Sequence, residues 1–184
     1  MTSRKNWLLK ERSCRLDKFY TRKETAFKSL SILEEHIDLD IYDFHLEPSA
    51  GDGAFFNLLD PMKRIGLEID PSLGDPDAKP TTNDHTMETK IIKKDFFDFV
   101  PERNKKYLVI GNPPFGKGNS KAIQFFNQAA LFSDCIAFIL PRTFKRISLQ
   151  NRLNLYFDLS YSEDIPTDPC CFIPKMGAKC CFQI

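Results

Sequence analysis

The chain has 184 residues, of which 42% are hydrophobic and 28% are charged, and its formal net charge is +1. This composition is typical of a globular protein with a single core. No apolar run reaches the roughly 20 residues that a membrane-spanning helix needs, and the charged N-terminus lacks the apolar segment of a signal peptide. We therefore expect a cytoplasmic protein with no membrane partner.

The charge is unevenly distributed along the chain. Residues 1–28 hold nine Lys and Arg against three acids, and residues 115–152 hold six against one. Residues 1–18 are expected to be a basic N-terminal arm and residues 19–184 one domain. Two basic segments in one small domain predict either a positive rim for phosphates or ordinary solvated surface charge.

The first predicted helix follows Phe19. Thr21 and Glu24 have the spacing of a capping box. Apolar residues then recur at helical spacing, which predicts about four turns with an inward face; these residues are Ala26, Phe27, Leu30, Leu33 and Ile37.

Two strands and a glycine-containing turn follow. Residues 43–47 predict a strand, residues 48–53 a turn in which Gly51 and Gly53 let the backbone approach a ligand, and residues 54–59 a short helix. Residues 64–70 predict a second strand that ends in acidic side chains, which can accept hydrogen bonds from ribose hydroxyls or simply start a turn. Residues 71–90 are predicted to be a loop.

Residues 91–94 predict a third strand, followed by Asp95 and Phe96. A carboxylate at the end of this strand can accept from an amine of a ligand, with the aromatic ring of Phe96 against it. The alternative is that Asp95 caps the next turn.

The central feature is residues 107–116, where an apolar strand meets Pro113 and Pro114. Both prolines lack an N–H and fix their own φ, so a stiff extended turn follows the strand. In open α/β sheets, ligands bind at this end of a strand. Asn112 and Pro113 offer two oxygen acceptors that could hold a planar amino group, such as the exocyclic amine of adenine, and localise its lone pair. Phe115 would then stack on the base that carries this amine. The alternative is a strand end with a capping Asn.

The rest of the chain supplies candidate substrate contacts. Lys117 lies in a glycine-containing loop before a helix predicted from Ser120 to about Phe132, with Leu131 facing inward. Residues 135–140, 155–161 and 180–184 predict further strands, and the proline-rich segment 166–177 is expected to line a base pocket with Phe172. Basic side chains follow the strand at 135–140 and are candidates for nucleic-acid backbone contacts: Arg142, Lys145 and Arg146.

The six cysteines lack CxxC spacing. Reduced, mostly buried thiols are favoured over a metal site, so no metal ligands are assigned.

The catalytic segment Asn112-Pro113-Pro114-Phe115 and the upstream segment Glu47-Pro48-Ser49-Ala50-Gly51-Asp52-Gly53 together resemble the S-adenosylmethionine-dependent amino methyltransferases. The likeness is nearest to N6-adenine DNA methyltransferases whose cofactor motif precedes the catalytic one, and it runs from about Phe19 to the end. It implies the α/β fold of class I methyltransferases, a Rossmann-like, seven-stranded, mostly parallel sheet with helices on both faces and the last strand antiparallel.

The resemblance also implies site residues. The catalytic group is Asn112, Pro113, Pro114 and Phe115. The residues that would bind S-adenosylmethionine are Tyr20, Thr21, Glu47, Pro48, Ala50, Gly51, Gly53, Glu68, Ile69, Asp95, Phe96 and Asn112. Phe115, Lys117, Arg142, Lys145 and Arg146 are expected to contact the substrate.

The implied reaction is methylation of the exocyclic amine of adenine in a nucleic acid, with DNA favoured over RNA. The chain has no room for a recognition domain, so specificity would come from its own basic segments or from a separate subunit. The alternatives are an RNA adenosine methyltransferase, a protein glutamine methyltransferase and a non-catalytic subunit with this fold.

Overall fold

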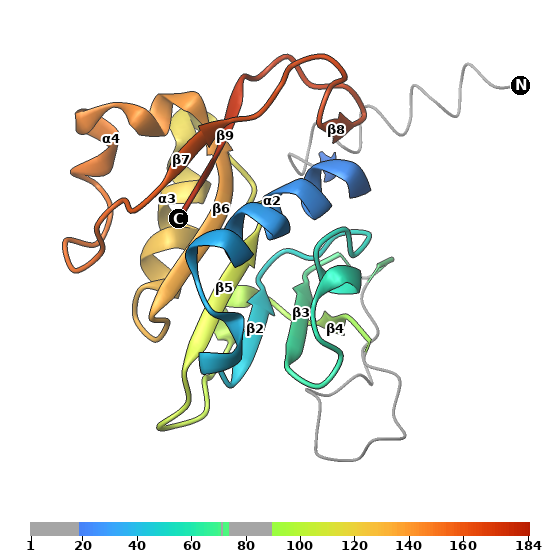
Figure 1. Cartoon of the computed structure of the whole chain (residues 1–184), viewed down its shortest axis with the longest axis vertical. Coiled ribbons are helices and arrows are strands. Elements are labelled where there is room, and N and C mark those ends of the chain that lie inside the picture. Colours follow the sequence, from blue (N-terminus) through green and yellow to red (C-terminus); the bar gives the residue numbers. More distant parts are fainter. Residues whose placement is uncertain (1–18, 71, 74–89) are drawn as a thin grey trace, which may run out of the picture.

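The computed structural model describes residues 19–70, 72–73 and 90–184, so the predicted arm and almost all of the loop predicted at 71–90 lie outside the described residues. Seven strands form one sheet in the order β4-β3-β2-β5-β6-β9-β7 (Figure 1). They are β2 (Phe44–Glu47), β3 (Arg64–Glu68), β4 (Ile92–Lys93), β5 (Tyr107–Gly111), β6 (Cys135–Pro141), β7 (Ser162–Asp164) and β9 (Cys180–Gln183). Strands β2 to β6 pair in parallel and β9 is antiparallel to both neighbours, as predicted.

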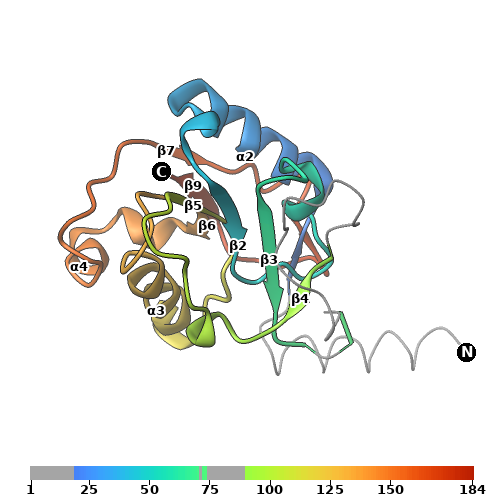
Figure 2. The same cartoon turned by 90° about the horizontal axis from the view of Figure 1, so that it is seen from below.

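Helices cover both faces of this sheet. Helix α2 (Lys23–His36) lies on one face, while α3 (Ser120–Ala129) and the short α4 (Ile147–Gln150) lie on the other (Figure 2). Five short 3-10 turns connect the elements: η1 (Leu39–Ile41), η2 (Phe56–Leu58), η3 (Phe96–Asp98), η4 (Lys117–Asn119) and η5 (Arg142–Lys145).

The central strands are buried on both sides. Every residue of β5 and β6 is buried, because a parallel strand between two layers of helices has no solvated face. Along β5, Leu108 and Ile110 belong to the core under α2, whereas Tyr107 and Val109 belong to the core under α3. The alternation follows from the two-residue period of a strand.

A second, two-stranded sheet joins distant parts of the chain. β1 (Tyr20–Thr21) pairs antiparallel with β8 (Phe172–Ile173). Beside this pair, Arg22 donates from its backbone N–H to the Cys171 carbonyl at 2.9 Å and from Nε to the Cys170 carbonyl at 2.8 Å. The predicted capping box is therefore wrong: Thr21 is committed to a strand, and α2 starts after Arg22 without a side-chain cap.

The strand predicted at 155–161 is also wrong. The edge strand β7 starts only at Ser162. The Asn154 side chain accepts the backbone N–H of Tyr156 at 3.0 Å, and the Asn154 carbonyl accepts that of Phe157 at 3.2 Å. These bonds close a turn, and they leave Leu155 and Tyr156 87% and 96% exposed instead of paired in the sheet.

The predictions for three helices need correction. Residues 54–59 form turns and η2 instead of a helix, and α3 ends at Ala129 instead of near Phe132. Phe27, expected to face inward, is 62% exposed because it lies off the stripe formed by Ala26, Leu30 and Leu33. Leu131 is 72% exposed because it follows the end of α3. Within the described ranges, no helix has both the length and the apolar character to cross a membrane.

Candidate functional site

A cavity of about 380 Å³ lies where β2, β3, β4 and β5 end, at the carboxyl edge of the sheet. The topology explains its place, since the loops after parallel strands all emerge at this edge. The cavity brings together most of the residues predicted for the cofactor and for catalysis: Tyr20, Thr21, Glu47, Pro48, Ala50, Gly51, Glu68, Ile69, Asp95, Phe96, Asn112, Pro113, Pro114 and Phe115.

Asn112 has an asymmetric environment. Its Nδ2 donates a hydrogen bond to the backbone carbonyl of Phe19 at 3.1 Å. Its Oδ1 is buried and has no hydrogen-bond partner among the described residues. Because only the amide nitrogen can donate to a carbonyl, this contact assigns the orientation of the amide. The oxygen is thus the end of the Asn112 amide that has no partner in the described part of the protein, and Asn112 itself lines the cavity.

Glu68 closes the glycine turn that follows β2. One carboxylate oxygen accepts the N–H of Gly51 at 2.9 Å, and the other accepts the N–H of Asp70 at 2.8 Å. Gly51 has a φ of +54°, and a Cβ at this position would lie 2.9 Å from the Tyr20 ring. The turn therefore requires glycine at position 51, because its backbone has a positive φ and because the Tyr20 ring lies too close for a Cβ.

Glu47 is the most deeply buried carboxyl group of the cavity. Burial holds the pKa of Glu47 well above its ordinary value. The hydrogen bond from the Phe56 N–H lowers this pKa, whereas the negative charges of Asp52 and Glu68 raise it further. The Phe56 N–H donates to its Oε2 at 2.7 Å. Burial also raises the pKa of Asp52. This end of the cavity therefore favours a ligand that brings positive charge.

Another part of the cavity lining is aromatic. Phe96 is buried and packs on Phe125 with ring centroids 5.2 Å apart, and Phe97 meets Phe125 edge-on at the same distance. Asp95 caps η3 by accepting the Phe97 N–H at 3.0 Å, which is the simpler of the two roles considered for it. Both Asp95 and these rings line the cavity.

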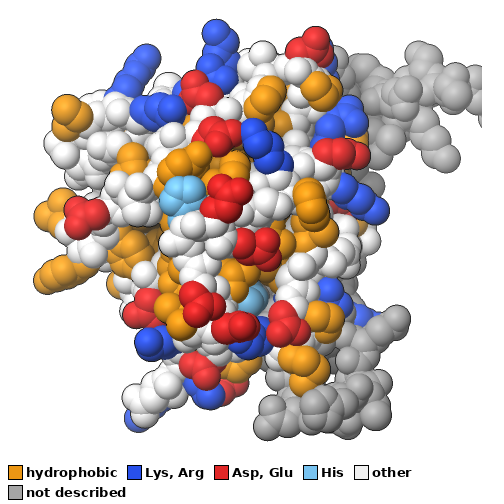
Figure 3. All heavy atoms as spheres, in the orientation of Figure 1, with side chains coloured by type: hydrophobic (Ala, Val, Ile, Leu, Met, Phe, Trp, Pro, Cys, Tyr) orange, Lys and Arg blue, Asp and Glu red, His pale blue; other side chains and the backbone are white. Residues whose placement is uncertain are grey.

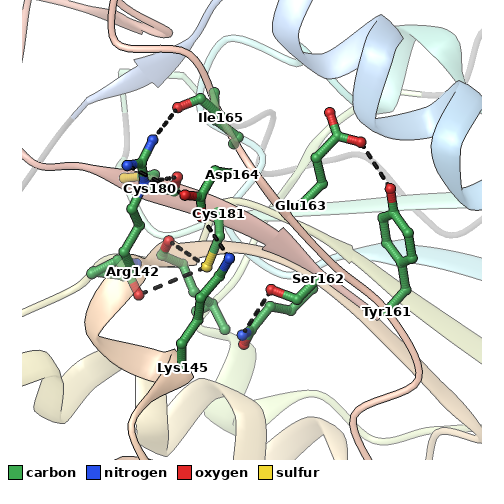
Figure 4. A network of polar contacts seen from close by, with 12 residues as sticks. Arg142, Lys145, Tyr161, Ser162, Glu163, Asp164, Ile165, Cys180 and Cys181 are labelled. Carbon is green, nitrogen blue, oxygen red and sulfur yellow. Dashed lines mark hydrogen bonds and ion pairs between the residues drawn. The ribbon is translucent and has the colours of Figure 1, made fainter.

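Five predicted site residues are not among those that line the cavity: Gly53, Lys117, Arg142, Lys145 and Arg146. Arg142 and Lys145 instead join η5 to β7 and β9 (Figure 4). Both pair with Asp164, at 3.3 Å and 2.6 Å, and Arg142 also donates to the carbonyls of Ile165 and Cys180. Lys117 and Arg146 are exposed.

Several lining residues were not predicted. Phe19 arrives through the β1–β8 pair, a long-range pairing that no local pattern signals. Met176, in the loop after β8, belongs to the segment 166–177 that was expected to line the pocket. Lys121 and Gln124 come from the first turns of α3, and Lys94 directly precedes the predicted Asp95. Phe172 was expected in the pocket, but it is fully buried behind Phe115, with ring centroids 6.2 Å apart.

The described cysteines are all free and buried, as predicted: Cys135, Cys170, Cys171, Cys180 and Cys181. Cys14 lies outside the described residues. Burial raises the pKa of Cys135 to about 11. No group of three or more His, Cys, Asp or Glu side chains in the described part of the chain is arranged to hold a metal ion.

Comparisons with known proteins place this geometry in a fold class. No protein-family model matches the sequence, and no curated protein matches it. Among solved structures, a "putative RNA methyltransferase" from Pyrococcus horikoshii superimposes with a TM-score of 0.62 at 17% identity, over 91% of this chain and 85% of that one. A "putative class I S-adenosylmethionine-dependent methyltransferase" from Listeria monocytogenes gives 0.63 at 14% identity, over 89% of this chain and 59% of that one.

The chain therefore has the fold of the class I methyltransferases, as its sequence predicted. The match spans less than two thirds of the Listeria protein.

Proposed function

We propose that this chain is an S-adenosylmethionine-dependent methyltransferase that methylates the exocyclic N6 amine of adenine in a nucleic acid, DNA in the first instance. The observation that carries the proposal is the amide of Asn112. Its nitrogen is committed to Phe19, and its buried oxygen has no partner in the described part of the protein. Such a group accepts hydrogen bonds, and an exocyclic amine donates them.

The cavity suits the proposed cofactor by the chemistry of its lining. S-adenosylmethionine, when bound, supplies an electrophilic methyl group on a positively charged sulfonium, and it also carries an ammonium group, a ribose and an adenine ring. Carboxyl groups line the cavity near the glycine turn, namely Glu47, Asp52 and Glu68. The aromatic wall around Phe96 would receive the adenine ring.

The residues of this chain would act on the amine. The oxygen of Asn112 and the carbonyl of Pro113 would accept its two N–H groups, draw the nitrogen toward a tetrahedral shape and localise its lone pair. Phe115, steadied by its edge contact with Phe172, would stack on the base. The base must leave its stack to reach the cavity.

Basic side chains at the cavity support a nucleic-acid substrate. Lys94 and Lys121 line it, and Lys117 is exposed beside it in η4. On the face that carries α2, by contrast, acidic and basic side chains are intermingled (Figure 3). We infer that phosphates bind at the cavity rim through Lys117 and Lys121, with Arg146 as a further candidate. Arg142 and Lys145 would contribute less, because both already form ion pairs with Asp164.

RNA is the second candidate substrate. The similar structure from Pyrococcus horikoshii is described as a "putative RNA methyltransferase", and its fold matches over 91% of this chain. The cavity chemistry does not discriminate between the two nucleic acids, because the amine of adenine is the same in both.

The test offers methyl-labelled cofactor to the purified protein with DNA, RNA and protein extract in separate reactions. We expect label in N6-methyladenine of one nucleic acid, identified after digestion to nucleosides. Label in protein alone would replace the adenine proposal with glutamine methylation. Absence of measurable cofactor binding would replace it with a non-catalytic role for this fold.

A further inference from the structure

Asn112 is fixed at two points by groups from distant parts of the chain. Its side-chain Nδ2 donates to the Phe19 carbonyl at 3.1 Å, and its backbone carbonyl accepts the Ser49 hydroxyl at 3.2 Å. Phe19 directly precedes β1, which β8 holds in place, and Ser49 lies in the turn after β2. Both residues line the cavity with Asn112.

We propose that the Phe19 carbonyl and the Ser49 hydroxyl are positioning groups that set the Asn112 amide with its oxygen, and not its nitrogen, available to the substrate, so that the site selects groups that donate N–H. The inference rests on the proposed function, and it names what determines the specificity of that site.

The two ends of an amide have nearly the same shape, so packing alone does not choose between them. Phe19 offers a carbonyl, which only accepts. If the Asn112 amide were reversed, two acceptors would face each other and the buried nitrogen would lose its partner, which disfavours that orientation by about tenfold to a hundredfold. A base with a keto oxygen at the same position would likewise meet the Asn112 oxygen as acceptor against acceptor.

Ser49 acts on the backbone of the same residue. Its hydrogen bond restrains the peptide that joins Asn112 to Pro113, whose carbonyl is the second proposed acceptor. Loss of the Ser49 hydroxyl should therefore lower turnover while leaving the cofactor-binding turn in place, because catalysis depends steeply on the placement of such acceptors.

The first test replaces the Asn112 amide by a carboxyl group. In Asn112→Asp the ionised side chain has no donor for the Phe19 carbonyl. Protonation restores a donor at one oxygen and leaves an acceptor at the other. We expect the activity of this variant, relative to wild type, to rise at least about tenfold between about pH 8 and about pH 5. A flat ratio across this range, equal to that of Asn112→Ala, would overturn the assigned role of Phe19.

The second test separates positioning from general structure. Ser49→Ala should reduce kcat about tenfold with the KM for cofactor within about twofold, and Ser49→Thr should recover most of kcat. The matched control is Ser133→Ala, a buried serine just after the turn that follows α3, whose hydroxyl donates to the Ala129 carbonyl at 2.9 Å. Equal effects at Ser49 and Ser133 would refute the positioning role of Ser49.

A third measurement needs no activity. In nitrogen-15-labelled wild-type protein, the side-chain amide protons of Asn112 should exchange at least about tenfold more slowly than those of the exposed Asn104. If the two exchange at the same rate, the Phe19 contact is not maintained and the positioning proposal fails. If exchange is slow but no amine of any substrate is methylated, the proposed function fails and the assigned amide orientation stands.

Discussion

The carboxylate of Glu68, at the end of β3, accepts the backbone N–H of Gly51, in the turn after β2, at 2.9 Å. This bond joins the carboxyl ends of two neighbouring parallel strands. The second oxygen of Glu68 accepts the Asp70 N–H, so the side chain organises both loops before any ligand arrives.

Replacement of Glu68 by Gln should weaken both folding and cofactor binding. The Gln amide has one acceptor oxygen for the N–H groups of Gly51 and Asp70. One of these two N–H groups would therefore face the NH₂ end of the amide, which is itself a donor. We expect a loss of about 1–3 kcal/mol in the free energy of unfolding, measured with denaturant, together with weaker cofactor binding by calorimetry. Glu34→Gln, on the exposed side of α2, is the control and should change neither quantity. An unaltered Glu68→Gln protein would show that this carboxylate does not organise the turn.

Replacement of Gly51 by Ala tests the approach of Tyr20. The new Cβ would lie 2.9 Å from the ring at a φ of +54°. We expect a destabilisation of about 1–2 kcal/mol from the backbone conformation alone, with cofactor affinity reduced further because Tyr20 must move. Gly177→Ala is a matched control, since nothing lies within 4 Å of its Cβ position. Equal thermal melting of the two variants would contradict this account.

Asn112→Ala tests the proposed reaction. Loss of the acceptor oxygen should lower the rate of methyl transfer by about 10²–10³-fold, because that oxygen acts on the amine in the transition state. Cofactor affinity should stay within about threefold of wild type, since the glycine turn is unaffected. Retention of most of the activity would remove Asn112 from the catalytic group.

Glu47 predicts a dependence of stability on pH. Its pKa is raised in the folded protein, so the folded state holds this proton more tightly than the unfolded chain. The stabilising contribution of the protonated carboxyl is present below its ordinary pKa of 4.5 and is lost as the pH rises through the raised value. The unfolding free energy of Glu47→Gln, relative to wild type, should therefore increase from about pH 4 to about pH 8.

The same carboxyl should respond to a cationic ligand. Positive charge beside Glu47 favours its ionised form, so wild-type affinity for S-adenosylmethionine should rise with pH while that of Glu47→Gln rises less. Calorimetric titration across the pH range measures both slopes. Parallel slopes would place the cationic groups of the cofactor away from Glu47.

The rim lysines predict a salt dependence. If Lys117 and Lys121 each contact a phosphate, affinity for the nucleic-acid substrate should fall steeply with salt, and each change to Ala should reduce the log–log slope by about one. Lys106→Ala, at the opposite edge of the sheet before β5, is the control. A slope that neither rim variant changes would exclude these two lysines as phosphate contacts.

The sequence predicted the centre of the fold and the edge of the sheet that holds the cavity well, because their signals are local. β5 and β6 are apolar runs that end in proline or glycine, and the turn from Pro48 to Gly51 carries its own conformational requirement. These patterns also located Asn112, Glu68 and Asp95 at one edge of the sheet, since parallel strands direct their ends the same way.

Two of the failures come from pairing across long distances in the sequence, and one comes from a local turn. Thr21 resembles a helix cap, but it pairs with Phe172 and belongs to strand β1. Leu155 and Tyr156 resemble a strand, but Asn154 closes a turn there. Arg142 and Lys145 have the composition of a phosphate site, yet Asp164 on β7 pairs with both. None of these partners could be identified from spacing alone.

The position of β9 has a consequence for the order in which the protein can assemble. Its residues, Cys180–Gln183, follow β7 in the sequence, yet they lie between β6 and β7. Until they emerge, β6 presents an unpaired, apolar edge, and such edges invite association with other chains. A chain synthesised only as far as β7 would therefore have a sheet that ends at β6, and the edge of β6 would stay open to other chains until β9 is made.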